Sequence, residues 1–191
     1  MAIPGWTALE QLKDGNRRFQ AGTSQPTPAL SLSERVRMAA GQQPFAAVLG
    51  CSDSRVPVET IFDCGPGDLF VVRVAGNIAA PTQIASLAFA VEKFETRLVV
   101  VLGHTYCGAV QATLEALEAG VAGDGGPLIG RIRPAVEGLE GSGPDLVRRA
   151  VRANVAASVE TLRGVIEGEG LLVVGAEYDL ETGEVAVLDA G

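Results

Sequence analysis

Four short apolar segments, each flanked by glycine or proline, constrain the fold of this chain more than any other feature. They span residues 45–49, 69–74, 98–102 and 171–174. Such nearly continuous apolar sequence over four to six residues is typical of strands that are covered on both faces. We therefore expect these segments to be strands in the middle of the structure, not strands of an open, half-solvated sheet.

Helical patterns separate these segments. Residues 81–94 and 108–119 read as helices, and a long helix with an apolar stripe begins near Pro144. Strand and helix in alternation predict a parallel sheet with right-handed crossovers. Residues 171–179 and 184–188 read as a hairpin that adds an antiparallel edge strand. The fold class is therefore α/β: a central, mostly parallel β-sheet flanked by helices, with an antiparallel C-terminal edge strand.

The N-terminal part reads as a helical arm and linker, residues 1–28, within a single domain of residues 1–191. Residues 7–10 have the form of a capping box that opens a helix to about Ala21, and a second short helix spans 33–41. The residues near one face of the first helix are Trp6, Leu9, Leu12, Asn16 and Phe19. This helix packs either on its own sheet or on another subunit, and the sequence does not distinguish the two.

Composition excludes several classes of function. The 191 residues are 47% hydrophobic and carry 15 Lys+Arg against 23 Asp+Glu, a net charge of −8. An acidic chain without basic runs is not expected to bind nucleic acid or an anionic membrane. The longest apolar stretch is far shorter than the roughly 20 residues of a membrane span, and no signal-peptide core is present near Met1. We expect a soluble, cytoplasmic protein.

The cysteine and histidine counts are more restrictive still. The chain has 3 Cys and 1 His. Three cysteines are too few for a disulfide framework, which fits a reducing compartment. One histidine makes three-His zinc sites and H-E-x-x-H proteases impossible within one chain.

Unusual residues follow three of the predicted strands. These strand ends are the segments 50–55, 75–77 and 103–108, which bring Cys51, His104 and Cys107 toward one edge of the sheet. In a parallel sheet the carboxyl ends of the strands share that edge, where ligands bind.

Two thiolates and one imidazole are ligands that Zn²⁺ prefers, and three protein ligands leave its fourth position open. An H-x-x-C pattern alone is weak, because a histidine at a core edge is more often only hydrogen-bonded; the second strand-end cysteine strengthens it. Cys107 also precedes a predicted helix, whose dipole favours a thiolate. Cys64 comes before the next strand, at the opposite end, and reads as a small core residue. The count favours a catalytic over a structural zinc site.

Asp53 and Arg55 alternate with Cys51, so the three side chains are expected on one side of the backbone. One interpretation is a surface ion pair of little consequence. Beside a metal the pair has a use: Arg55 keeps Asp53 ionised and oriented, and Asp53 accepts the hydrogen of a zinc-bound hydroxide.

These residues match a known family. The segments 51–57 (CSDSRVP), 73–77 (RVAGN) and 103–108 (GHTYCG) resemble the β-class carbonic anhydrases, and the likeness extends over nearly the whole chain. The resemblance implies reversible hydration of CO2 to bicarbonate and a proton, with one Zn²⁺ per chain. It implies Cys51, His104 and Cys107 as ligands, Asp53 with Arg55 as a catalytic dyad, and a homodimer or dimer of dimers.

The resemblance also implies a substrate pocket. The positions that match the family's pocket for CO2 or bicarbonate are Gln42, Phe70, Ala75 and Gly108. A pocket Gln and Phe are typical of the plant-like subtype. Phe89 stands where that subtype commonly has Tyr, and it joins Phe70 and Ala75 as an apolar surface for CO2. Val48 stands where the bicarbonate-regulated subtype has Trp.

Two other functions remain open at this point. One is hydrolysis of CS2 or carbonyl sulfide on the same scaffold, which the intact Asp53 and Arg55 disfavour. The other is a non-catalytic zinc or redox module, in which Cys51 and Cys107 form a disulfide when metal is lost. A permanent fourth ligand from Asp53 would indicate the second alternative.

Overall fold

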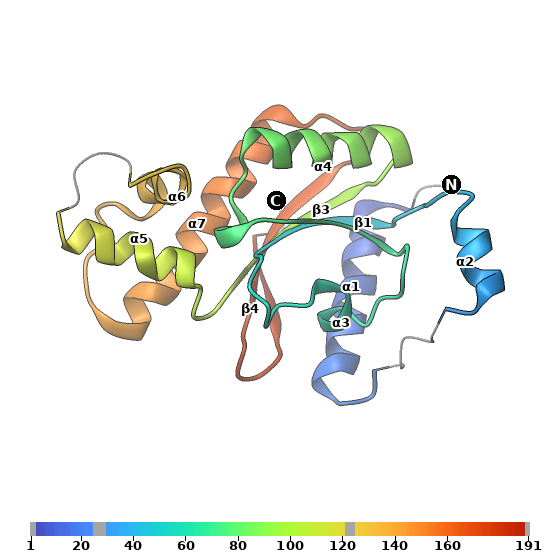
Figure 1. Ribbon diagram of the computed structural model, residues 1–191, viewed down its shortest axis with the longest axis horizontal. Helices are drawn as coiled ribbons and strands as arrows, with labels where there is room; N and C mark the ends of the chain where they lie inside the picture. Colours follow the sequence, from blue (N-terminus) through green and yellow to red (C-terminus); the bar gives the residue numbers. More distant parts are fainter. Residues whose placement is uncertain (1–2, 25–29, 121–124, 190–191) are drawn as a thin grey trace.

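The computed structural model describes residues 3–24, 30–120 and 125–189 (Figure 1). Its centre is a five-stranded sheet of order β2-β1-β3-β4-β5. The strands are β1 (Ala46–Gly50), β2 (Leu69–Arg73), β3 (Leu98–His104), β4 (Leu172–Tyr178) and β5 (Val185–Asp189). The first four are parallel, and β5 runs antiparallel to β4. The predicted α/β class, with an antiparallel C-terminal edge strand, is therefore confirmed.

The strand ends decide where the site lies. β3 extends beyond the apolar segment to His104, because its pairing with β4 continues until His104 faces Tyr178. The register of β1 against β2 ends at Gly50 opposite Arg73, so Cys51 is the first residue past the ladder. The carboxyl ends of β1 and β3 therefore deliver two of the expected ligands to one edge.

The described helices are α1 (Gly5–Gln20), α2 (Leu32–Met38), α3 (Val58–Ile61), α4 (Pro81–Phe94), α5 (Gly108–Glu118), α6 (Ile129–Val136) and α7 (Gly143–Val165), with a 3-10 turn η1 (Ala75–Asn77). Helices α4, α5 and α7 occur where the sequence pattern predicts them. The sequence analysis did not predict α3 or η1, which have four and three residues. They are too short to show a helical period.

Helices cover both faces of the sheet (Figure 1). On one face, α4 and α7 bury Leu49, Val101 and their neighbours with Leu87 and Leu162. On the other, α1 and α3 bury Val48, Val100 and the adjacent side chains. A third apolar cluster joins α5, α6 and the start of α7 past the carboxyl ends of the strands. The site edge is thus bounded by helix α5 and the start of α7.

Helix α1 packs on its own sheet, which resolves the alternative left open by the sequence. Ala8, Leu9 and Leu12 are buried in the cluster on that face. Asn16 Nδ2 donates to the carbonyls of Ile61 at 3.2 Å and Gly183 at 2.9 Å, tying the helix to α3 and to the hairpin. Trp6, which the sequence places near the same face of the helix, is 55% exposed and lies outside this buried set.

The prediction of a capping box at residues 7–10 was wrong, because α1 begins at Gly5 after an N-cap at Pro4. A capping box occurs instead at the start of α2, where Ser31 and Glu34 bond reciprocally. Residues 1–2 and 25–28 of the predicted arm and linker lie outside the described residues. Within the described ranges, no helix is both long and apolar enough to cross a membrane.

Candidate metal centre

Cys51, His104 and Cys107 come together at the carboxyl edge of the sheet. Their ligand atoms all lie within 4.8 Å of one another, and all three side chains are buried. Cys51 follows β1, His104 ends β3, and Cys107 is the N-cap of α5. Cys64 does not belong to this group and packs against the core cluster under α1. The convergence predicted from the strand ends is therefore present.

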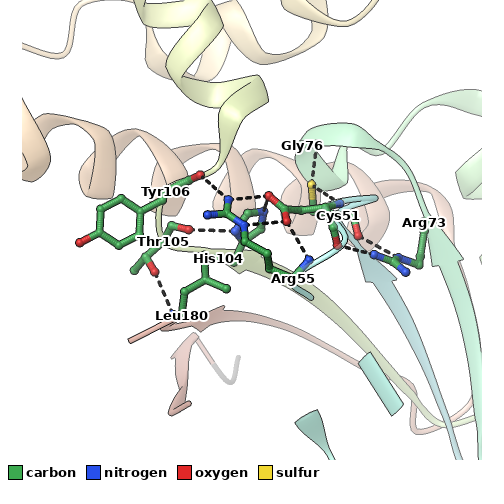
Figure 2. A network of polar contacts seen from close by, with 9 residues as sticks. Cys51, Arg55, Arg73, Gly76, His104, Thr105, Tyr106 and Leu180 are labelled. Carbon is green, nitrogen blue, oxygen red and sulfur yellow. Dashed lines mark hydrogen bonds and ion pairs between the residues drawn. The ribbon is translucent and has the colours of Figure 1, made fainter. Parts of the chain in front are cut away.

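His104 is prepared to bind a metal through one ring nitrogen. Its Nδ1 lies 2.9 Å from the carbonyl oxygen of Thr105, an acceptor, so Nδ1 carries the proton (Figure 2). The Nε2 atom is buried and has no hydrogen-bond partner among the described residues. A buried nitrogen lone pair without a partner is costly unless a ligand occupies it. This tautomer, fixed from behind by a carbonyl, is the one that metal-binding histidines use.

The two sulfurs have opposite pKa shifts. The pKa of Cys51 is lowered, first by donation from the neighbouring Cys107 thiol and also by the N–H groups of Asp53 and Gly76. Those N–H groups lie 3.4 and 3.3 Å from the Cys51 sulfur (Figure 2). The pKa of Cys107 is raised, because its proton is held by Cys51. Two adjacent sulfurs, one of which ionises readily, suit a divalent cation, since cysteine binds metal as the thiolate.

Asp53 and Arg55 form a bidentate pair beside this group. Arg55 Nε donates to Asp53 Oδ1 at 3.0 Å, and Nη2 donates to Oδ2 at 2.7 Å. The Arg55 side chain, together with its backbone N–H, holds the pKa of the Asp53 carboxyl well below its usual range. Oδ2 lies 3.9 Å from His104 Nε2. Asp53 is therefore an ionised acceptor at the border of the candidate metal position.

Arg73, at the end of β2, holds the loop that carries this pair. Its guanidinium donates to the carbonyl of Cys51 at 2.9 Å and to the carbonyl of Asp53 at 2.6 Å (Figure 2). Arg73 lies in the segment 73–77 that resembles the family, but the sequence pattern alone assigns it no role. A charged residue at the end of an otherwise apolar strand was the available signal.

Tyr106 adds a second support that the sequence analysis did not identify. Its φ of +58° is in the left-handed region, which non-glycine residues rarely adopt. In this conformation its carbonyl accepts from Arg55 Nη2 at 3.2 Å, while its hydroxyl donates to Glu181 at 2.7 Å. The turn between His104 and Cys107 thus also positions the guanidinium of Arg55.

The five predicted pocket residues occupy three places in the fold. Ala75 begins η1 and precedes Gly76, whose N–H donates to the Cys51 sulfur. Gly108 begins α5 directly after Cys107. Phe70 on β2 and Phe89 on α4 pair with ring centroids 6.5 Å apart, and Phe89 is 52% exposed. Gln42 is exposed in the segment before β1.

Two cavities lie away from these five residues. One of about 810 Å³ is bounded by α5, the start of α7 and the β4–β5 hairpin. Another of about 500 Å³ lies along α7 beside β4 and β5. Neither is lined by any of the five predicted pocket residues, so these cavities do not form the expected substrate pocket.

Comparisons with known proteins agree with this chemistry. Residues 46–185 match the model of a protein family described as carbonic anhydrase. Carbonic anhydrase 2 of Mycobacterium tuberculosis is 39% identical over 197 residues, covering 98% of this chain and 93% of that protein.

Two solved structures share the fold. A Coccomyxa β-carbonic anhydrase in complex with acetazolamide gives a TM-score of 0.69 at 26% identity, over 96% of this chain and 88% of that one. A structure described with two tetrameric β-carbonic anhydrases of Sordaria macrospora gives a TM-score of 0.66 at 29% identity. The match covers 81% of this chain and 85% of that one.

Proposed function

This chain belongs to the β-class carbonic anhydrases and catalyses the reversible hydration of CO2, and we propose that it does so with one zinc ion held by Cys51, His104 and Cys107. The observation that carries the ligand assignment is the buried Nε2 of His104, which has no partner among the described residues and borders two cysteines. Zinc, when bound, lowers the pKa of a water molecule toward neutrality and so supplies hydroxide.

We assign the orientation of that hydroxide to Asp53. Because Arg55 keeps the carboxylate ionised, Asp53 can accept a hydrogen bond but cannot donate one. Its Oδ2 lies 3.9 Å from His104 Nε2 and would accept the hydrogen of the hydroxide that bound zinc would supply, which would direct a lone pair toward CO2. A permanently ligating Asp53 would exclude this role, but both carboxylate oxygens are bonded to Arg55. This pairing favours hydration over a closed, non-catalytic site.

We further propose that Phe70, Phe89 and Ala75 supply the apolar surface for CO2, with Gln42 and Gly108 as polar contacts to bicarbonate. CO2 is uncharged, so an apolar surface favours its binding. Gln42 and Phe70 support the plant-like subtype. At Val48, a fully buried valine on β1 stands where the bicarbonate-regulated subtype has Trp.

We propose that a second copy of the chain covers the exposed apolar side chains of Phe89 and helix α2. Phe89, Leu32 and Val36 are 52%, 70% and 65% exposed, and no residue of α2 is buried. Exposed apolar groups of this size mark interaction surfaces. A homodimer or dimer of dimers would cover them, and the Sordaria macrospora enzymes are described as tetrameric. The free thiols further support a cytoplasmic location.

The ligand assignment is tested by zinc content and stopped-flow CO2 hydration on the same preparations. Cys51→Ser should lose both zinc and hydration, because the thiolate supplies binding energy. Cys64→Ser is the matched control, since Cys64 lies outside the group, and it should keep both. Full zinc occupancy in Cys51→Ser would overturn the assignment. Faster turnover of CS2 or carbonyl sulfide than of CO2 would instead support the alternative hydrolase.

A further inference from the structure

Two buried polar side chains on α7 contact the turn η1. Asn154 and Ser158 are 2% and 5% exposed and lie one helical turn apart. Asn154 Nδ2 donates to the carbonyl of Gly76 at 2.7 Å, and Ser158 Oγ donates to the carbonyl of Asn77 at 3.2 Å. Their helical neighbours Val151, Val155, Val159 and Leu162 are apolar core residues. A buried polar side chain in such an apolar face lowers the stability of the fold unless it forms hydrogen bonds.

The turn that they contact has an unusual backbone. Gly76 has a φ of +68° and Asn77 a φ of +43°. A side chain at Gly76 would be strained at this φ, and its Cβ would also lie 3.3 Å from the Cβ of Ala109. A positive φ costs glycine little, but at Asn77 it persists only where the surroundings hold it in place. Asn154 is hydrogen-bonded to Gly76, and Ser158 is hydrogen-bonded to Asn77.

The same turn reaches the metal group. The N–H of Gly76 donates to the sulfur of Cys51 at 3.3 Å (Figure 2). Gly76 is thus held at its carbonyl by α7 while its amide is directed at a ligand atom. A hydrogen bond to a thiolate draws electron density from the sulfur and fixes the direction of its lone pairs. The path from Asn154 to Cys51 consists of two hydrogen bonds through one residue.

We propose that Asn154 and Ser158 are positioning residues of the metal centre: they hold η1 so that the Gly76 N–H stays on the Cys51 sulfur. The inference rests on the proposed role of Cys51 as a zinc ligand. Asn154 acts on Gly76 directly, while Ser158 acts on the following residue. Loss of Asn154 therefore affects the thiolate more than loss of Ser158.

The rival interpretation is that the two side chains only stabilise the packing of α7. The test compares Asn154→Ala and Ser158→Ala with Val159→Ala, which removes buried methyl groups from the same helix without a bond to η1. Three quantities are measured: zinc affinity by chelator competition, the sulfur-to-cobalt charge-transfer absorption of the cobalt-substituted protein, and hydrogen exchange of the Gly76 amide.

For Asn154→Ala we expect about 10- to 100-fold weaker zinc binding, the range typical of residues behind metal ligands. We also expect a shifted charge-transfer band and faster exchange at Gly76. Ser158→Ala should change all three in the same direction by less, and Ser158→Thr, which keeps the hydroxyl, should restore them. Val159→Ala should lower the melting temperature but leave all three at wild-type values.

Wild-type zinc affinity, band position and Gly76 exchange in Asn154→Ala would overturn the inference, whatever its stability. If Asn154→Ala does not fold, Ser158→Ala decides: wild-type values there would overturn the inference as well. Failure of the ligand assignment is distinguishable, because wild-type protein would then show no sulfur-to-cobalt band at all.

Discussion

Asp53 and Arg55 have different roles at the site. Arg55 holds the carboxylate, and the carboxylate accepts a hydrogen at the border of the metal group. Asp53→Asn replaces one acceptor oxygen by an amide that donates, while Cys51, His104 and Cys107 are unchanged. We expect zinc to remain while kcat falls by about 10²-fold or more, the usual loss for a positioned acid–base or oxyanion-type group.

Asp63→Asn is the control for this change, because Asp63 forms a comparable carboxylate–guanidinium pair with Arg18 away from the site. Its turnover should match that of wild type. Near-normal kcat in Asp53→Asn, measured by stopped flow at full zinc occupancy, would show that the Asp53–Arg55 pair has no part in the reaction.

Cys64 gives a prediction about pH. Burial, together with Asp68 and Asp63, raises the pKa of its thiol to about 12. An unfolded cysteine ionises near pH 8.5. The neutral thiol therefore contributes to stability below that pH, and the contribution is lost as pH rises toward 12. Wild type should lose urea stability relative to Cys64→Ser between pH 9 and pH 10.5, with a constant difference between pH 6 and pH 8.

An unchanged difference up to pH 10.5 would contradict the raised pKa of Cys64. Alkylation provides a second measurement, because the thiolate is the reactive form. Native Cys64 should react with iodoacetamide at pH 8 far more slowly than the same residue in urea.

Single residues were predictable where chemistry and position coincided. Cys51 and His104 follow apolar segments, so their positions at the ends of predicted parallel strands place them at one edge of the sheet. Arg73 and Asn154 were not identified, because each donates to a backbone carbonyl of another segment. Tyr106 was not identified either, because it acts through its own carbonyl, which accepts from Arg55. Carbonyl and amide partners leave no mark in the sequence pattern.

At the scale of elements, the contact of α1 with α3 depends on one glycine. A Cβ on Gly15 would lie 1.8 Å from the carbonyl oxygen of Phe62. Gly15→Ala gains about 1 kcal/mol of helix propensity, but overpacking costs about 1–3 kcal/mol and more where backbone must move. Because a backbone oxygen cannot yield, we expect net destabilisation of about 2 kcal/mol in urea unfolding.

Gly164→Ala is the matched control, because nothing lies within 4 Å of a Cβ at that position in α7. This variant should be unchanged or stabilised by up to about 1 kcal/mol. Equal stability of the two variants would show that α1 does not pack against α3 in this way.

The elements themselves were predictable in proportion to their length. Helices α4 and α7 have 14 and 23 residues, enough for the helical period to appear in the sequence. The start of α1 could not be predicted from the sequence, because it depends on tertiary structure. A Cβ at Gly5 would lie 2.5 Å from the carbonyl oxygen of Arg97. The glycine allows the first turn to approach β3, and the apparent capping box at Thr7 falls inside the helix.

For the whole molecule, strand and helix alternation predicted the parallel sheet, but it did not predict the surface that a second copy would cover. Val36 on α2 is 65% exposed in one chain, and Val165 on α7 is 56% exposed. If α2 lies in the contact between copies, Val36→Ser should weaken self-association in sedimentation velocity without lowering the stability of the single chain. Val165→Ser makes the same substitution on α7 and serves as the control. Equal losses of self-association in the two variants would contradict this placement of the contact.

Proton release concerns the whole molecule, because each hydration event must deliver a proton to solvent. The usual carrier near neutral pH is a histidine, and the only histidine in the sequence is His104, the proposed zinc ligand. Near the site, a hydrogen bond to Glu181 raises the pKa of Tyr106, and Arg55 keeps that of Asp53 far below neutral.

External buffer must then carry the proton. At pH 7 and constant ionic strength, kcat should rise with the concentration of an imidazole-type buffer, while kcat/KM for CO2 barely changes, since that ratio covers steps before proton release. A buffer with a pKa two units away should have a much smaller effect at the same concentration. A kcat that stays flat in both buffers would require an internal carrier and would contradict this account.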